Sequence, residues 1–292
     1  MPKILITGVN GFTGRYVADL FVREGYDVIG LVHGVPGENQ VACDLTDRDA
    51  VFEVVRRMQP DGVIHLAALS FVGHDNPEEF YNTNVVGTLN IIEAYSEFGS
   101  QKGKIIVASS ANVYGTPDVE IIDELIAPAP VNHYAASKVA MEHLVRTWFD
   151  SLSIIITRPF NYTGSGQDSK FLVPKIVDHF KRKCEVIELG NTDVYRDFTD
   201  VRDVAEAYFR LYQSSVRSET INICSGRVSS LQEIISKMNR LAGYEIKVRV
   251  NPDFVRENEI RVLKGSCEKL GRLTGFKPLI ELDETLSRML SD

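Results

Sequence analysis

Residues 3–14 read KILITGVNGFTG, a short apolar run that passes directly into three glycines. The apolar run at residues 4–7 predicts a buried strand, and the periodic pattern over residues 13–24 predicts a helix that ends at Gly25. The glycines let the backbone turn sharply and approach a ligand closely, while the helix offers free N–H groups and the positive end of its dipole. A glycine turn between a strand and a helix is typical of sites that bind the pyrophosphate of a dinucleotide.

The same alternation of strand and helix continues through the first half of the chain. Further apolar strands are expected at residues 28–32, 41–43, 63–66, 105–109 and 154–157. Helices are expected at residues 47–58 with a capping box of Thr46 and Asp49, at 77–98 with Pro77 in first position, and at 132–150 with Asn132 as cap. Strands that are apolar throughout and separated by helices form a parallel sheet covered on both faces. The predicted fold class is therefore α/β, a Rossmann-type doubly wound parallel sheet.

The pattern becomes less regular after about residue 158. In this part of the 292-residue chain we expect helices at 174–183, 204–214 and 231–241, a strand at 220–224 and a loop at 197–202. A chain of this length holds one large domain or two. We expect residues 1–158 to form a dinucleotide-binding domain, with returning segments around 196–225. Residues 159–292 are expected to form mainly a smaller C-terminal substrate-binding lobe.

The composition is that of an acidic, soluble globular protein. There are 32 Lys and Arg residues against 40 Asp and Glu residues, which gives a formal net charge of −8. Such a chain is a poor ligand for nucleic acids or anionic membranes, and no apolar run approaches the ~20 residues of a spanning helix. The four cysteines are far apart, and neither they nor the six histidines show the spacing of a metal site. We expect a cytoplasmic protein without a signal peptide, metal, nucleic-acid or membrane partner.

Two residues on the expected helix 132–150 have the spacing of a catalytic pair. Tyr134 and Lys138 are four positions apart and share one helix face. A lysine cation beside a phenol favours the phenolate, so we expect it to lower the pKa of Tyr134 from about 10 and make this residue a general acid or base. Ser109 and Ser110 end the expected strand 105–109, and ligands of open α/β sheets bind at the carboxyl ends of strands.

The cofactor subtype depends on the end of the second strand. A carboxylate there bonds the ribose 2′-hydroxyl of NAD, but this strand is followed by His33 and Gly34. NADP(H) is therefore favoured over NAD(H), although no arginine is present for the 2′-phosphate. Asp44, after the third strand, is a candidate acceptor for the adenine amino group.

These motifs together resemble the extended short-chain dehydrogenases/reductases that act on nucleotide sugars. The matching motifs cover nearly the whole chain in the family's order: TGxxGFxG at 7–14, DL at 44–45, HLAA at 65–68, NVxGT at 84–88, SSxxVYG at 109–115, YxxxK at 134–138, RPFN at 158–161, RDFxDVxD at 196–203, NxCSG at 222–226 and GFxP at 275–278.

The resemblance implies roles for individual residues. Tyr134 is implied as the proton donor or acceptor, Lys138 as the ribose anchor that tunes it, and Ser110 as the hydrogen-bond donor to the reacting oxygen. The expected cofactor contacts are Gly8, Asn10, Gly11, Phe12, Thr13, Gly14, His33, Asp44, Leu45, Leu66, Ala67, Ala68, Asn84, Ser109, Tyr134, Lys138 and Pro159.

Within this family the C-terminal segments resemble GDP-4-keto-6-deoxy-D-mannose reductases, which make GDP-D-rhamnose. The shared pattern is PFNxxGxGQ at 159–167, with departures at Tyr162, which replaces a histidine, and Ser165, which replaces a proline. The group's RPxE motif appears as RENE at 256–259. The implied substrate contacts are Ser70, Ser110, Asn161, Arg196, Arg256 and Glu259, with the arginines as diphosphate clamps.

The resemblance thus implies NAD(P)H-dependent reduction of the C4 ketone of a nucleotide-linked 4-keto-6-deoxyhexose. A GDP sugar is favoured, dTDP and UDP sugars remain open, and the product is a rhamnose or a 6-deoxytalose. The alternatives are a 4-epimerase with tightly bound NAD and a non-catalytic nucleotide-binding sensor. A 4,6-dehydratase is disfavoured because Ala111 and Asn112 stand where that reaction needs a carboxyl group. A homodimer through the helices at 77–98 and 132–150 is also expected.

Overall fold

The computed structural model describes residues 1–71, 75–255 and 261–292. Its centre is a seven-stranded sheet in which all neighbouring strands are parallel. In sheet order these strands are β11 (Glu219–Ile223), β6 (Ile154–Pro159), β5 (Lys104–Ala108), β4 (Gly62–His65), β1 (Lys3–Thr7), β2 (Asp27–Val32) and β3 (Gln40–Ala42). The predicted doubly wound parallel sheet is confirmed, and β11 is a segment of the second half that returns to it.

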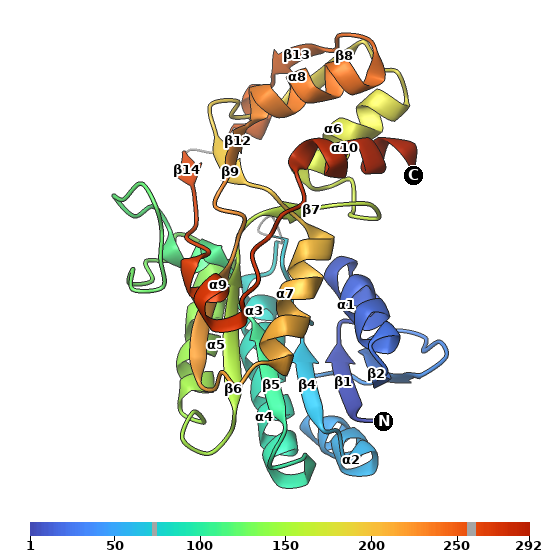
Figure 1. Ribbon diagram of the computed structural model, residues 1–292, viewed down its shortest axis with the longest axis vertical. Helices are drawn as coiled ribbons and strands as arrows, with labels where there is room; N and C mark the ends of the chain where they lie inside the picture. Colours follow the sequence, from blue (N-terminus) through green and yellow to red (C-terminus); the bar gives the residue numbers. More distant parts are fainter. Residues whose placement is uncertain (72–74, 256–260) are drawn as a thin grey trace.

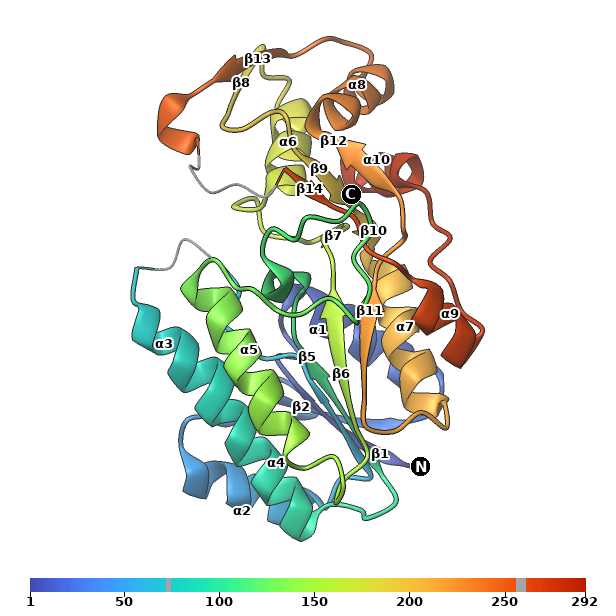
Figure 2. The same cartoon turned by 90° about the vertical axis from the view of Figure 1, so that its left-hand side faces the viewer.

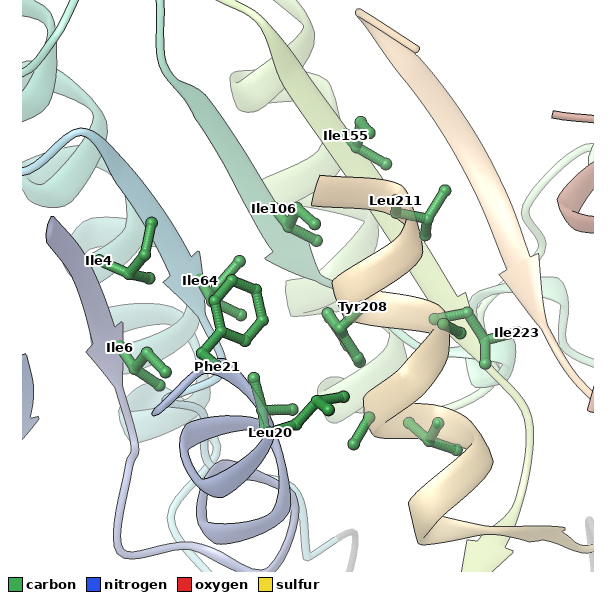
Figure 3. Close-up of a cluster of buried hydrophobic side chains, with 14 of the residues drawn as sticks. Ile4, Ile6, Leu20, Phe21, Ile64, Ile106, Ile155, Tyr208, Leu211 and Ile223 are labelled. Carbon is green, nitrogen blue, oxygen red and sulfur yellow. The ribbon is translucent and has the colours of Figure 1, made fainter. Parts of the chain in front are cut away.

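Helices cover both faces of the sheet (Figure 2). One face carries α2 (Arg48–Met58), α4 (Gly87–Phe98) and α5 (His133–Arg146), and the other carries α1 (Phe12–Arg23), α7 (Val201–Gln213) and α9 (Glu268–Thr274). Figure 3 shows isoleucines of β1, β4, β5 and β6 facing Leu20 and Phe21 of α1 and Tyr208 and Leu211 of α7. This double cover explains why the strands are apolar throughout, since side chains on both of their faces are buried.

A smaller lobe lies beyond the carboxyl ends of the strands (Figure 1). Its core lies between α6 (Leu172–Lys181), α8 (Leu231–Ala242) and α10 (Leu282–Ser291). Its short strands form three small sheets: β8 (Val186–Leu189) with β13 (Lys247–Val250), β9 (Tyr195–Asp197) between β12 (Val228–Ser230) and β14 (Val262–Leu263), and β7 (Tyr162–Thr163) with β10 (Thr199–Asp200). The division of the chain at about residue 158 remains a prediction.

The remaining elements are short and include an unusual turn before α4. They are α3 (Pro77–Tyr81), the π-helix η1 (Asn82–Val86), and the 3₁₀ helices η2 (Ala111–Tyr114) and η3 (Pro252–Phe254). The single long helix expected at 77–98 is thus α3, η1 and α4 in succession. Within the described residues, no helix has the length and apolar character that crossing a membrane requires. The four cysteines are all free thiols.

Three local predictions were wrong. The cap of α2 is Asp47, whose carboxylate accepts from Ala50 N, because the hydroxyl of Thr46 is used by Asp44. Helix α5 ends at Arg146, and turns rather than α-helix fill residues 147–150. The expected loop at 197–202 contains β10 and the start of α7, since Asp200 caps that helix by accepting from Arg202 N.

Candidate functional site

The glycine turn between β1 and α1 leaves no room for side chains. Gly8 has φ +69°, and a Cβ atom there would lie 2.9 Å from the backbone nitrogen of Ala67. A Cβ atom on Gly14 would lie 2.1 Å from the carbonyl oxygen of Gly8. No side chain caps the N-terminus of α1, where Gly11 is the N-cap residue. A close backbone approach and uncapped N–H groups fit the pyrophosphate of a dinucleotide, as predicted from the sequence.

A buried chain of hydrogen bonds fixes the residues that follow β4, beneath the glycine turn. The Thr7 hydroxyl accepts from the amides of residues 66 and 67 at 3.1 and 3.0 Å, so its own proton is directed to His65 Nδ1 at 2.8 Å. Thr88 Oγ1 donates to the Asn84 carbonyl oxygen and lies 2.9 Å from His65 Nε2, which is therefore the protonated nitrogen. Burial lowers the pKa of His65 to about 3, so the ring is neutral and keeps one tautomer.

The side chain of Asn84 connects these residues to the catalytic helix. It lies in η1 and is fully buried. Its oxygen accepts from Leu69 N at 2.9 Å, and its nitrogen donates to the Leu69 carbonyl oxygen and to Ser137 Oγ at 3.1 and 3.0 Å. Ser137 in turn donates to the carbonyl oxygen of Tyr134. The Asn84 amide therefore braces the loop after β4 against α5, and its predicted contact with a cofactor remains a prediction.

The structure gives Ser110, Tyr134 and Lys138 buried positions next to the end of β5. Tyr134 and Lys138 lie in the first two turns of α5, which Asn132 caps as predicted by accepting from Ala135 N. Their residues are 7% and 3% exposed, and Ser110, which follows β5, is 9% exposed. Lys138 Nζ donates to the carbonyl oxygen of Ala108, the last residue of β5, at 2.8 Å. This bond sets the position of α5 against the strand end that presents Ser110.

The electrostatics of the pair differ from the sequence-based expectation. Burial raises the pKa of Tyr134 to about 12, although a hydrogen bond with Ser110 lowers it in part. Burial lowers the pKa of Lys138 to about 8, against an opposing effect of Glu142. Loss of solvent therefore dominates the pKa of the phenol, and the rise is opposite to the lowering that was expected from the lysine. At neutral pH, Tyr134 carries its proton and Lys138 carries its charge, which suits proton donation.

A buried ion pair that the motifs did not indicate lies behind the triad. Glu142 Oε2 accepts from Arg158 Nη2 at 2.6 Å, and Glu142 Oε1 accepts from Arg158 Nε at 2.8 Å. Glu142 Oε1 also accepts from the hydroxyl of Ser109 at 2.6 Å, so that hydroxyl is already bonded within the protein. Glu142 lies one turn after Lys138, and the spacing of residues 134, 138 and 142 on one helix face was the available signal.

The expected adenosine end of the site lies where β2 and β3 finish. Asn10 and Gln40 exchange amide hydrogen bonds of 3.3 and 2.8 Å. His33 is exposed, and its Nε2 lies 4.0 Å from Asp44 Oδ2. Hydrogen bonds from Thr46 lower the pKa of Asp44. The strand order thus brings a carboxylate beside the end of β2, where the sequence of that strand has none.

The predicted substrate contacts lie in several separate elements. Arg196 is on β9, with 8% of its surface exposed, and Nη1 donates to the carbonyl oxygens of Tyr195 and Arg261 at 2.9 and 3.2 Å. Asn161 follows β6 and is exposed, and Ser70 is exposed in the loop after β4. Pro159 ends β6. Arg256 and Glu259 lie outside the described residues.

The aspartates of the RDFxDVxD motif join distant parts of the second half. Asp197 is fully buried and accepts from Thr199 Oγ1, from the amide and hydroxyl of Ser225, and from the amide of Gly226. Asp203 accepts from the amides of residues 279 and 280. Asp200 accepts from Thr285 Oγ1 in α10. These carboxylates hold the strand of Arg196 and the C-terminal segments in place, a role that the sequence analysis missed.

Comparisons with known proteins decide the family. A family model described as GDP-mannose 4,6 dehydratase matches residues 5–289. The chain belongs to this family. It is 36% identical over 274 residues to a GDP-6-deoxy-D-talose 4-dehydrogenase of Aggregatibacter actinomycetemcomitans, covering 94% of this chain and 91% of that protein. It is 32% identical over 302 residues to a GDP-6-deoxy-D-mannose reductase of Pseudomonas aeruginosa, covering 99% and 96%.

Solved structures of the family have the same fold. A putative epimerase from Burkholderia cenocepacia J2315 is 43% identical, with a TM-score of 0.93 over 99% of this chain and 97% of that one. The RMD protein of Pseudomonas aeruginosa, solved with NADPH, is 30% identical, with a TM-score of 0.88 over 100% and 98%. These matches confirm the sequence-based prediction of an extended short-chain dehydrogenase/reductase, and with it the prediction of an enzyme.

The family model is named for a dehydratase, and the residues after Ser110, the predicted catalytic serine, bear on that reaction. Ser110 is followed by Ala111 and Asn112 in η2, where Asn112 N donates to the serine hydroxyl oxygen at 3.2 Å. Neither side chain has a carboxyl group to move a proton in an elimination of water. The family model thus establishes the relationship, and these two residues argue against the reaction in its name.

Proposed function

We propose that the protein is an NAD(P)H-dependent reductase that converts the C4 ketone of a nucleotide-linked 4-keto-6-deoxyhexose to an alcohol. The observation that carries this proposal is the buried Ser110, Tyr134 and Lys138 with no carboxyl group at positions 111 and 112. GDP-4-keto-6-deoxy-D-mannose is the favoured substrate, because both relatives described above are named for GDP-linked 6-deoxy sugars. A dTDP- or UDP-linked sugar is the alternative.

The residues of the triad have distinct tasks in this reaction. The bound reduced nicotinamide supplies the hydride. Tyr134, which burial keeps protonated at neutral pH, donates its proton to the oxygen that becomes the C4 hydroxyl. Ser110 donates a hydrogen bond to the same oxygen, and the Lys138 cation stabilises the charge that develops on Tyr134. The uncapped N-terminus of α1 holds the cofactor pyrophosphate.

The proposal also includes a preferred cofactor and a preferred product. NADP(H) is favoured over NAD(H) because β2 itself ends without an acid, and the related RMD structure contains NADPH. The nearby carboxylate of Asp44 acts against this preference. GDP-D-rhamnose is the favoured product, and GDP-6-deoxy-D-talose is the alternative that the first relative supports.

A 4-epimerase is the second candidate function, because the 43% identical structure is described as a putative epimerase. An epimerase keeps its NAD and returns the hydride to the same sugar. NADPH labelled with deuterium at the transferred position separates the two functions. We expect product NMR to show deuterium at C4 of the sugar, in proportion to the NADPH oxidised.

The configuration at C4 of this product distinguishes rhamnose from 6-deoxytalose. A sugar without deuterium, together with NAD released from the purified protein on denaturation, would instead identify an epimerase. Catalytic interconversion of a GDP-hexose with its C4 epimer in the absence of added cofactor would confirm that outcome.

We also propose that two copies of the chain associate through α4 and α5. Half-buried apolar side chains on these helices, on η1 before α4 and on the turns after α5 include Val85, Leu89, Val139, Leu144 and Trp148. Ile92, which was expected to serve the same contact, is fully buried in the core and is not available for it. Light scattering at micromolar concentration should give the mass of a dimer, and a monomer mass would refute this arrangement.

A further inference from the structure

The segment that leads from β6 into the substrate lobe contacts the first turns of α1. This segment includes Tyr162 and Ser165, two of the positions at which the sequence departs from the motifs of the reductases that it resembles. Three side-chain hydrogen bonds join it to α1: Thr13 Oγ1 with Tyr162 Oη at 2.7 Å, Tyr16 Oη to the Ser165 carbonyl oxygen at 2.9 Å, and Arg15 Nη2 to the Gly166 carbonyl oxygen at 2.8 Å. The helix that follows the glycine turn is thus attached to a segment about 150 residues away in the chain.

Tyr162 makes the most specific of these contacts. Its ring stacks on Phe12 with centroids 5.9 Å apart and planes 8° from parallel. Burial raises the pKa of Tyr162, so its hydroxyl is protonated at neutral pH and forms a neutral hydrogen bond with Thr13. Both partners, Phe12 and Thr13, are in the first turn of α1, at the end where the pyrophosphate is expected.

The residues that follow Tyr162 reach the substrate lobe. Thr163 pairs with Asp200 in the small sheet of β7 and β10, and its hydroxyl contacts Met289 Sδ of α10 at 3.6 Å. Met289 belongs to the buried core of the lobe, and Asp200 also accepts from Thr285 of α10. A continuous path of contacts therefore runs from α1 through residues 162–163 to α10.

We propose that Tyr162 is a positioning residue that couples the binding of the cofactor to the binding of the nucleotide sugar. A cofactor that orders the first turn of α1 also orders residues 162–166 through the Tyr162 hydroxyl, and through them the lobe that receives the sugar. The coupling is reciprocal, so a bound nucleotide tightens cofactor binding by the same factor. The inference rests on the proposed function in taking α1 as the cofactor site and the lobe as the sugar site.

Binding measurements on the intact protein test this coupling without turnover. The dissociation constant of NADPH is measured by titration calorimetry with and without saturating GDP, and that of GDP with and without saturating NADPH. We expect each ligand to tighten the other by about fivefold or more in the wild type. Tyr162→Phe keeps the ring on Phe12 but removes the hydroxyl, so the coupling should fall by about threefold or more, toward independent binding, the effect of one net hydrogen bond.

Tyr26→Phe is the matched control. Tyr26 lies just beyond the other end of α1, and its hydroxyl accepts from Gln213 Nε2. This variant should keep the wild-type coupling. Thr13→Val removes the opposite partner of the bond and should lower the coupling as much as Tyr162→Phe. The double variant should show no additional loss, because the same bond is already broken.

Hydrogen exchange gives a second readout. In the wild type, NADPH alone should slow amide exchange at residues 162–167, and in Tyr162→Phe this protection should be lost. Independent binding of NADPH and GDP in the wild type, or unchanged coupling in Tyr162→Phe, would overturn the proposal. Failure to reduce a keto sugar would bear on the proposed function alone, because both binding constants are measured without turnover.

Discussion

The main sheet with its helices, which is the proposed cofactor half, and the lobe around α6, α8 and α10, which is the proposed substrate lobe, are held together in different ways. In the cofactor half, the glycine turn, Ser110 and the loop after β4 all follow strands of one parallel sheet, which brings them to the same edge. In the lobe, the strand of Arg196 is fixed by Asp197, which accepts from backbone amides 28 and 29 residues away. Asp203 of α7 in turn holds the segment before α10 through amides 76 and 77 residues away. The positions of the proposed catalytic residues therefore depend mainly on sheet topology and local spacing, whereas the proposed substrate site depends on long-range contacts.

Replacing Tyr134 with Phe should have the largest effect and should be confined to the catalytic half. The variant removes the proton donor but keeps the buried ring, so kcat should fall by about 10²- to 10⁴-fold. Steady-state kinetics with the keto sugar measures this loss. Titration with NADPH and GDP should show binding close to that of the wild type. Full turnover by Tyr134→Phe would contradict the assignment of the triad.

The pH dependence tests the charge of Lys138. Its pKa is about 8 in the folded protein, so the residue is cationic below pH 8 and loses its proton as the pH rises through that value. Tyr134, with a pKa of about 12, stays protonated across the same range. The ratio kcat/KM reports the free enzyme, and we expect it to decline by about tenfold per pH unit above pH 8. A profile that stays flat to pH 10 would contradict this role of Lys138.

Asp197→Asn should weaken the lobe and spare the cofactor half. Asp197 accepts four hydrogen bonds. In the Asn variant an NH₂ group replaces one carboxylate oxygen, and this group can only donate, so it cannot accept from the donors that surround it. The free energy of unfolding should fall by about 1–3 kcal/mol, as measured by urea denaturation. The KM for the nucleotide sugar should rise several-fold, while the dissociation constant of NADPH should not change.

Asp178→Asn is the control for this prediction. Asp178 is a partly exposed residue of α6 that pairs with Arg182, the C-cap residue of that helix, and its loss should change stability by no more than about 0.5 kcal/mol. Equal effects of Asp197→Asn on the two ligands would show that the two regions are not held separately.

The smallest effect on the protein is expected from a change at the adenosine end of the expected cofactor site. His33→Glu places a carboxylate at the end of β2, where it bonds a ribose 2′-hydroxyl and repels a 2′-phosphate. The ratio of kcat/KM with NADPH to that with NADH should decrease by about tenfold, with unchanged folding. Gln232→Glu, which adds the same charge on the exposed surface of α8, should leave the ratio unaltered. An unaltered ratio in His33→Glu would remove this residue from the cofactor site.

The main sheet could be predicted from the sequence more completely than the lobe, because the patterns that form it are local in the chain and the contacts of the lobe are not. Strand, glycine turn and helix are adjacent in the chain, so the sheet, the pyrophosphate site and the positions of Ser110, Tyr134 and Lys138 were accessible from local patterns. The buried pair of Glu142 and Arg158 was not predicted: helix spacing places Glu142 on the face of Tyr134 and Lys138, but nothing local shows that Arg158 meets it. Burial also reversed the expected pKa shift of Tyr134, since the sequence does not reveal the degree of desolvation.

The lobe was predicted less completely for a physical reason. Its short strands are two to four residues long and pair with strands far away in the chain, so they show no clear periodicity. The backbone amides that donate to Asp197 and Asp203 lie at least 28 and 76 residues further along, respectively. Arg256 and Glu259, the remaining expected substrate contacts, lie outside the described residues.

The most direct test of the central claim is the oxidation of reduced nicotinamide by the wild-type protein with GDP-4-keto-6-deoxy-D-mannose. The reaction is followed by the loss of nicotinamide absorbance, in separate runs with NADPH and NADH and with Tyr134→Phe as the inactive control. The account predicts stoichiometric oxidation, faster with NADPH, that depends on Tyr134. No oxidation with either cofactor, by a protein that still binds both ligands, would contradict it.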